Sequence, residues 1–163
     1  MIACMPTPPL KTRLDTLDRD QLAALVERLV TRHPDLIDLV HIPLPGEKAP
    51  ADPISVGAHV TRILMMMGND WQASWRAQFN LFPIAAMGDD YRTQGLIEDA
   101  RTVYRAIIDA ILPMYEQIRD EESEIADVVG NCVEALGACL DATDDRELRN
   151  QILMDVFHVY RWD

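Results

Sequence analysis

The sequence predicts an all-α protein in which about seven helices stack as antiparallel hairpins in a short α-solenoid. Apolar residues recur at steps of three and four along most of the 163-residue chain, the spacing that places them on one side of a helix. The seven glycines are few, whereas Leu, Ala, Ile and acidic residues are plentiful, and this composition favours helices. The length is typical of one domain with a hydrophobic core of its own.

The N-terminal part is expected to contain an extended arm followed by one helix. Residues 1–17 include three prolines and are predicted to form the arm. The helix should begin near Asp18, because Asp18 and Gln21 have the spacing of a capping box. It should end near His33, since Pro34 disfavours helical geometry in the residue before it.

A proline-rich connector is predicted between this helix and the rest of the chain. Pro34 can open a short second helix over residues 35–41. Residues 43–53 then contain four prolines and one glycine, a composition typical of a connector. The pieces on either side look too small to be independent, so residues 18–163 are expected to form one helical-repeat domain.

An aromatic stripe follows the third predicted helix, which spans about residues 53–67. Trp71, Trp75, Phe79 and Phe82 lie at steps of four, four and three in the next helix. We expect this stripe to lie in the core, packed on the helix before it. If it is exposed instead, it is the best candidate on the chain for binding a protein partner.

The central feature is a helical hairpin predicted over residues 81–113, against which the other helices should stack. Gly95 and its polar neighbours mark the turn between the two helices. Small residues at Gly88 and Ala100 should let the helices approach closely. Pro113 is expected to end or kink the second helix. The apolar residues of the hairpin include Ile84, Met87, Tyr91, Val103, Tyr104, Ile107, Ile108, Ile111 and Leu112.

Residues of this hairpin also follow a longer pattern, Ile84-x2-Met87-Gly88-x2-Tyr91, then Ala100-x3-Tyr104, then Pro113. The pattern resembles one unit of the tetratricopeptide repeat, W-x2-L-G-x2-Y, A-x3-F and P over about 34 residues. It departs from that family at four positions. Ile84 stands in place of the Trp and Met87 in place of the Leu. Ile107 occupies a position that usually holds a small residue, and Pro113 comes one residue later than in the family pattern. The resemblance covers about a fifth of the chain and implies a stack of helices with a groove for a protein partner.

A second resemblance involves the two ends of the chain. The run RDEESEIADVVGNCVEALGACLDATDDRELRNQILMDVFHVYRW, residues 119–162, resembles helical regions that follow SWIM-type zinc fingers in some bacterial and archaeal proteins. LVERLVTRHPDLIDLV, residues 25–40, is similar to the start of the same regions. The Cys/His signature of the SWIM module itself is missing from this sequence, so the resemblance implies no zinc site.

Two more helices are predicted after the hairpin, with apolar residues over 125–140 and 148–160. Gly130 and Gly137 lie seven residues apart on the first of them and should permit close helix contact. The last helix remains apolar up to Trp162, whereas repeat arrays usually finish with a polar cap. Two explanations stay open: the chain is part of a longer protein, or it self-associates through this C-terminal helix.

The net charge of −12 is concentrated in the second half of the chain. Residues 1–80 carry a net charge of −1, and residues 81–163 carry −11. A surface this acidic repels phosphate backbones, so no nucleic-acid binding is expected. The acidic half is interpreted mainly as a solvated helix face, with a docking surface for a basic partner as the alternative.

The three cysteines, Cys4, Cys132 and Cys139, form no C-x-x-C pair and are interpreted as small core residues. Such usage suits a reducing cytoplasm. The sequence shows no signal peptide. Its apolar runs are all much shorter than the about 18 residues that a membrane-spanning helix needs. The predicted location is therefore the cytoplasm, without membrane contact.

No catalytic or cofactor-binding residue and no metal site is predicted. The chain contains no P-loop, dinucleotide fingerprint or nucleophile elbow. Asp155 and His158 have the i, i+3 spacing of carboxylate-bridged metal sites, but such sites need a second motif of this kind. Acidic pairs such as Glu121-Glu122 and Asp144-Asp145 are interpreted as charges that complement helix dipoles.

These observations favour a protein-interaction or scaffolding module with no catalytic activity of its own and no cofactor. Its expected partner is another protein, whose identity the sequence does not give. One alternative is a structural helical domain of a larger multidomain protein whose activity lies elsewhere. Another is a small metal-binding helical protein that uses carboxylates and His158.

Overall fold

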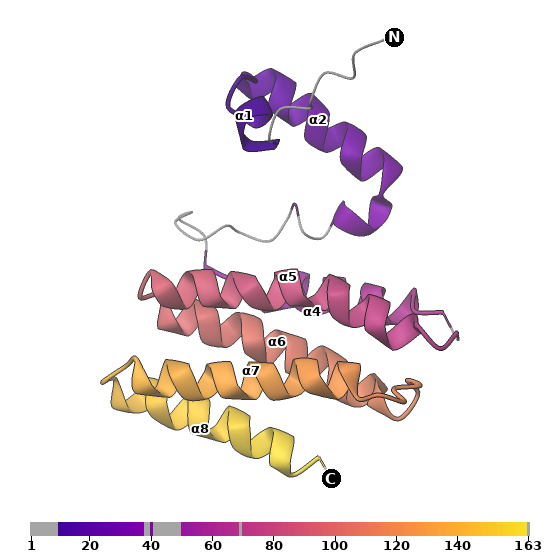
Figure 1. Ribbon diagram of the computed structural model, residues 1–163. Helices are drawn as coiled ribbons and strands as arrows, with labels where there is room; N and C mark the ends of the chain where they lie inside the picture. Colours follow the sequence, from indigo (N-terminus) through magenta and orange to yellow (C-terminus); the bar gives the residue numbers. More distant parts are fainter. Residues whose placement is uncertain (1–9, 38–39, 41–49, 69, 163) are drawn as a thin grey trace. The chain divides into compact units, whose positions relative to one another are not determined.

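The computed structural model describes residues 10–37, 40, 50–68 and 70–162, and all the regular structure in these residues is helical (Figure 1). The predicted all-α class is confirmed at this level. The chain divides into two compact units, Met1–Ile37 and Asp38–Asp163. Because that boundary falls inside the expected domain over residues 18–163, the single domain stays a prediction.

In the described residues of the N-terminal unit there are two α-helices and a short 3-10 helix. Helix α1 spans Leu10–Leu14, so the arm expected over residues 1–17 is not extended throughout. The first nine residues lie outside the described part of the chain. The 3-10 helix η1 spans Pro34–Leu36, at the start of the short helix predicted for 35–41. Ile37 and Val40 are also helical, whereas the other residues of that predicted helix and most of the proline-rich connector fall on residues that are not described.

Helix α2, Arg19–Arg32, begins and ends where the sequence predicts. The Asp18 carboxylate accepts a hydrogen bond from the backbone amide of Gln21 at 2.8 Å. In return, the Gln21 side-chain oxygen accepts from the Asp18 amide at 3.1 Å. The capping box is therefore complete, and it satisfies two backbone donors that a helix N-terminus otherwise leaves unpaired.

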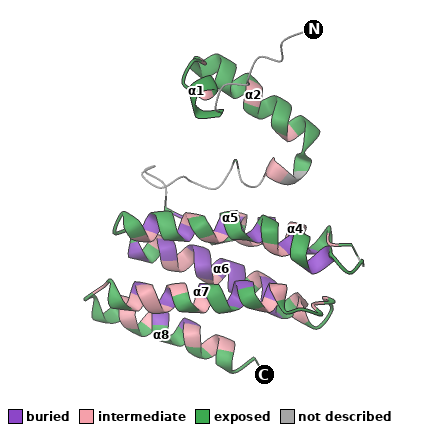
Figure 2. Cartoon of the chain, in the orientation of Figure 1, coloured by how far each residue is buried: buried purple, intermediate pink, exposed green. Residues whose placement is uncertain are grey.

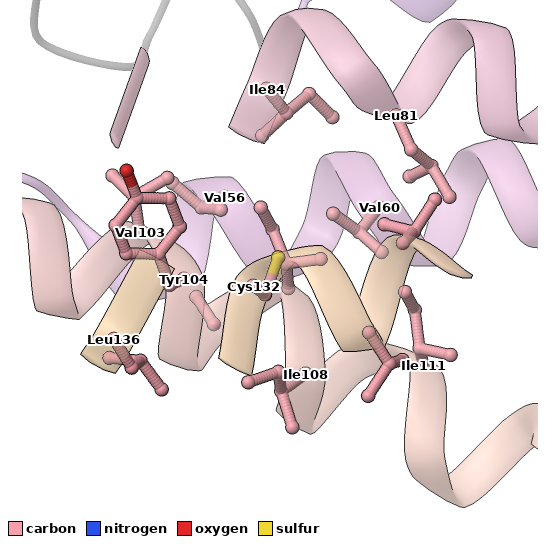
Figure 3. Close-up of a cluster of buried hydrophobic side chains, with 14 of the residues drawn as sticks. Val56, Val60, Leu81, Ile84, Val103, Tyr104, Ile108, Ile111, Cys132 and Leu136 are labelled. Carbon is pink, nitrogen blue, oxygen red and sulfur yellow. The ribbon is translucent and has the colours of Figure 1, made fainter. Parts of the chain in front are cut away.

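Among the described residues of the second unit, α6 is the helix around which four others pack. It contacts α4, α5, α7 and α8, and α5 also contacts α7 directly (Figure 1). Side chains from α4, α5, α6 and α7 meet in one buried cluster (Figure 3). The helices are α4 Pro53–Met65, α5 Ala73–Thr93, α6 Ile97–Tyr115, α7 Glu124–Asp141 and α8 Arg146–Tyr160.

The turn between α5 and α6 lies at Gly95, as predicted. Gly95 has a φ of +78°, in the left-handed region that costs glycine little. Its amide donates to the Arg92 carbonyl at 3.0 Å, and the Leu96 amide donates to the Tyr91 carbonyl at 3.0 Å. This pair of hydrogen bonds is the Schellman motif, which satisfies the last carbonyls of α5 while the chain reverses.

Helices α5 and α6 come into close contact where Tyr104 packs on Gly88. A Cβ atom built on Gly88 would lie 2.5 Å from Cε1 and 2.6 Å from Cζ of the Tyr104 ring. The ring is fully buried, and its hydroxyl donates to the Asp89 carboxylate at 2.9 Å. The predicted role of Gly88 is confirmed.

Two other predictions about these helices need correction. Gly130 and Gly137 of α7 face open space, because nothing lies within 4 Å of a Cβ built at either position. They do not mediate a close helix contact. Pro113 does not end α6, which continues to Tyr115; the kink that was the alternative stays a prediction.

The two described cysteines, Cys132 and Cys139, are buried in the α7 face that meets the core, as predicted. Burial raises the pKa of the Cys132 thiol to about 12 and that of Cys139 to about 11. Both groups are therefore neutral apolar fillers at physiological pH.

The Gly88 contact can be tested by adding one methyl group. We expect Gly88→Ala to lower the free energy of unfolding by about 1–3 kcal/mol, because the added carbon overlaps the Tyr104 ring and forces the helices apart. Urea unfolding followed by circular dichroism measures the change. The matched control is Gly130→Ala, in an open position of α7, which should raise stability by up to about 1 kcal/mol. Equal effects at the two positions would contradict the close contact.

Candidate functional site

The aromatic stripe predicted for the core is exposed. The exposed fractions are 78% for Trp71, 55% for Trp75, 67% for Phe79 and 42% for Phe82. The rings of Trp75 and Phe79 stack, with centroids 6.0 Å apart and planes 23° apart. The core assignment of this stripe is therefore wrong. We call these four residues the aromatic face; exposed positions recur along α5 in Figure 2.

The opposite side of the same segment explains the error. The buried residues of α5 in this region are Ala73, Ser74, Ala77, Leu81 and Ile84, at helical steps of one another. Ala73, Ser74 and Ala77 are small and let the start of α5 approach the neighbouring helices closely, and a Trp or Phe at these positions would hold the helices apart. The first half of α5 therefore has two sides without charged residues at these positions. The side with the smaller side chains is buried, and the side with the large aromatic side chains is exposed.

A cleft adjoins the aromatic face where the start of α5 meets the start of α7. It has a volume of about 260 Å³ and is lined by Trp71, Gln72, Trp75, Glu122 and Glu124. Ser74 Oγ donates to the Glu124 carboxylate at 3.0 Å. Gln78 Nε2 donates to the backbone carbonyl of Glu124, also at 3.0 Å. These two bonds fix the start of α7 against α5, and they position one wall of the cleft.

The charge of this cleft is negative. Its lining contains two carboxylates and no basic side chain. The nearest arginine along the chain, Arg76, forms an ion pair with Asp70 at 2.6 Å. This guanidinium, together with the Gln72 amide, holds the pKa of Asp70 below its usual value. Among the described residues, neither Glu122 nor Glu124 forms an ion pair, so the cleft keeps its charge.

Sequence reasoning missed the two glutamates of the cleft. The sequence indicates Glu122 only as a charge near a helix start, and it gives no signal for Glu124. The contact that brings Glu124 to Ser74 joins residues 50 positions apart in the chain. No spacing or motif within either segment signals such a long-range contact, because it depends on how α5 and α7 pack.

Asp155, which the metal hypothesis required, is instead held by arginines. Its side chain is buried and accepts from Arg101 Nε at 2.6 Å and from Arg105 Nη1 at 2.9 Å. Arg101 also donates to the side-chain oxygen of Gln151 at 2.9 Å. The carboxylate therefore joins α8 to α6 by ion pairs, and its charge is compensated by two cations.

The histidines do not gather into a metal site in the part of the chain that is described. His33 is exposed at the end of α2, His59 is buried in α4, and His41 is not described. His158 Nε2 lies 3.8 Å from the Asp109 carboxylate on α6. Within the described residues, no group of three or more His, Cys, Asp or Glu side chains is placed to hold a metal ion.

A second exposed apolar surface is formed by residues of α8 and by Trp162, which follows this helix. A cleft of about 520 Å³ opens beside it, and His158 and Trp162 face each other there with ring centroids 6.2 Å apart. The buried residues of α8 are only Ile152 and Asp155. The exposed apolar residues, which we call the α8 face, are Leu153, Met154, Phe157, Tyr160 and Trp162.

No protein-family model, curated protein or solved structure matches this chain. In the described part of the chain, no helix has both the length and the apolar composition needed to cross a membrane.

The exposure of the aromatic face predicts a contrast between two substitutions in α5. Phe79→Ala should change the free energy of unfolding by no more than about 1 kcal/mol, because the ring lies mostly in solvent and loses only its stack on Trp75. Ile84→Ala, in the core, should cost about 2–5 kcal/mol. Both values come from urea unfolding. If Phe79→Ala were as costly as Ile84→Ala, the ring would be part of the core and the aromatic face would not exist.

Proposed function

We propose that this chain is a protein-interaction module, without catalytic activity of its own, that binds its partner on the aromatic face. The observation that carries the proposal is the exposure of four large aromatic side chains on one side of α5 and the turn before it. Folded chains rarely leave a contiguous apolar patch of this kind in water unless another surface covers it. Trp and Phe are also among the residues that most favour the buried centres of protein interfaces.

The acidic charge of the chain supports a basic partner. Residues 81–163 carry a net charge of −11, and the acidic cleft adjoins the aromatic face. Opposite charges on two surfaces accelerate their encounter and disfavour wrong partners. The same charge disfavours nucleic acid, so the proposed partner is a protein. We propose the cytoplasm as the place of this interaction, in keeping with the reduced thiols.

We also propose that the second unit is organised as a short α-solenoid of stacked hairpins, similar to tetratricopeptide repeats. The support is the α5–α6 hairpin with its Gly88–Tyr104 contact and its Gly95 turn, which are elements of the repeat pattern in this sequence. Helices α7 and α8 then add a second hairpin, since α7 packs on α6 and α8 packs on α7.

The proposed function can be tested by capturing partners from the source lysate with paired baits. We expect a stoichiometric protein partner to bind the wild-type chain and to be lost with Trp75→Ser/Phe79→Ser, because these changes remove the centre of the aromatic face. Mass spectrometry identifies and quantifies the captured proteins. The matched control is Ile54→Ser/Met65→Ser, which removes two exposed apolar residues from α4.

A partner retained by the α4 control and lost by the α5 variant would support the proposal. Capture that is equal for the wild-type chain and both variants would contradict it. Circular dichroism of each bait establishes that the helices are unchanged, so a loss of binding is not a loss of folding.

The α8 face supports a second candidate function, self-association. Met154 and Phe157 are exposed residues of this face, and we expect Met154→Glu/Phe157→Glu to convert a dimer into a monomer of 18.5 kDa. Light scattering after size exclusion, over a series of concentrations, measures the mass. Met65→Glu, which places the same charge at an exposed position of α4, should leave the dimer intact. A wild-type chain that is monomeric throughout would rule out this candidate.

A further inference from the structure

The cleft beside the aromatic face combines two kinds of group that recognise the same ligand. Trp71 and Trp75 contribute indole rings, and Glu122 and Glu124 contribute carboxylates. The face of an indole attracts a cation through its quadrupole, more strongly than the face of Tyr or Phe. Carboxylates accept short, charge-assisted hydrogen bonds from ammonium and guanidinium groups. We therefore propose that this cleft binds the cationic end of a Lys or Arg side chain from the partner protein, an inference that rests on the proposed function.

The charge balance of the cleft leaves a place for such a cation. Glu121, beside Glu122 in sequence, is already paired with Arg119, and Asp70 is paired with Arg76. Among the described residues, Glu122 and Glu124 form no ion pair. A cation that enters the cleft therefore meets two carboxylates without displacing a salt bridge of this chain.

Helix α7 does not oppose this cation with its own N-terminus. The first amides of a helix carry partial positive charge, which repels cations unless it is compensated. Here the Asp120 carboxylate accepts from the Ile125 amide at 3.1 Å and from the Ala126 amide at 3.0 Å. These donors are satisfied within the chain, and the Glu124 carboxylate carries a further negative charge in the same turn.

The walls of the cleft are held in place before a ligand arrives. Ser74 and Gln78 of α5 fix Glu124 by the two hydrogen bonds given above, each of 3.0 Å. Trp75 stacks on Phe79, which restricts its ring. Binding in a preformed site loses less conformational freedom than binding that must first order its side chains.

The size of the cleft favours one side chain over a cofactor. Its volume of about 260 Å³ lies below the roughly 300–1,000 Å³ typical of sites for small molecules. Continuity with the aromatic face points to a side chain that belongs to a docked protein. The apolar stem of Lys or Arg can lie along the indole rings while its charged end reaches the carboxylates.

The test uses the full chain, labelled with ¹⁵N, and the side-chain probe Nα-acetyl-lysine amide. We expect the indole N–H resonances of Trp71 and Trp75 to shift saturably, with a Kd on the order of millimolar, as suits a single contact. The indole of Trp162, which follows α8 and lies outside this cleft, should not shift and serves as the internal control. Nα-acetyl-norleucine amide, which has an apolar chain without the ammonium group, should cause no saturable shift.

Substitutions then test the role of the carboxylates. Glu122→Gln/Glu124→Gln should weaken binding of the lysine probe about tenfold or more, because charge-assisted hydrogen bonds become neutral ones. Glu134→Gln removes one negative charge from an exposed position of α7 outside the cleft and should leave the Kd within about twofold. Equal shifts with the norleucine probe, or equal affinity in the Glu122→Gln/Glu124→Gln variant, would overturn the inference.

The inference and the proposed function fail in different ways. If a captured partner is lost with Trp75→Ser/Phe79→Ser but retained by Glu122→Gln/Glu124→Gln, the aromatic face binds the partner and the cation pocket is wrong. If the lysine probe binds in the cleft but no partner depends on Trp75 and Phe79, the proposed function is wrong and the pocket stands as a cation site.

Discussion

The packing of Tyr104 on Gly88 is the contact on which the arrangement of the second unit depends. The absence of a side chain at Gly88 lets a complete aromatic ring lie between α5 and α6, and this ring lies at one edge of the buried cluster in Figure 3. Once the helices are this close, the start of α5 can meet α6 and α7 only through small residues such as Ala73 and Ala77. The large aromatics of that segment are then left on the outside.

Sequence reasoning predicts local features of this fold well and the choice of buried face less well. The capping box at Asp18, the Gly95 turn and the role of Gly88 follow from residues close together in the chain, so they were recognised and are confirmed. The aromatic face was misassigned because hydrophobicity ranks Trp75 above Ala77, whereas close helix packing requires the smaller residue. Size complementarity between partner helices is a property of the packed pair, and one helix sequence does not reveal it.

The same limit applies to charge. The spacing of Asp155 and His158 was compatible with part of a metal site, but spacing does not show which cations approach from another helix. Arg101 and Arg105 of α6 both reach Asp155, so the carboxylate serves the contact between α6 and α8. Glu122 and Glu124 differ from Asp155, because no basic side chain among the described residues forms an ion pair with either carboxylate. Which acidic residues are available to a ligand is therefore decided by tertiary packing.

The acidic half of the chain and the aromatic face can act at different ranges in one binding event. Exposed charges are screened beyond about 8 Å at physiological ionic strength, so the net −11 of residues 81–163 mainly affects the rate at which a basic partner arrives. The aromatic rings act only in contact, where the apolar area that they bury slows dissociation. The cleft at Trp71 and Trp75 is the place where both contributions meet, because a cation there leaves water for two indoles and two carboxylates at once.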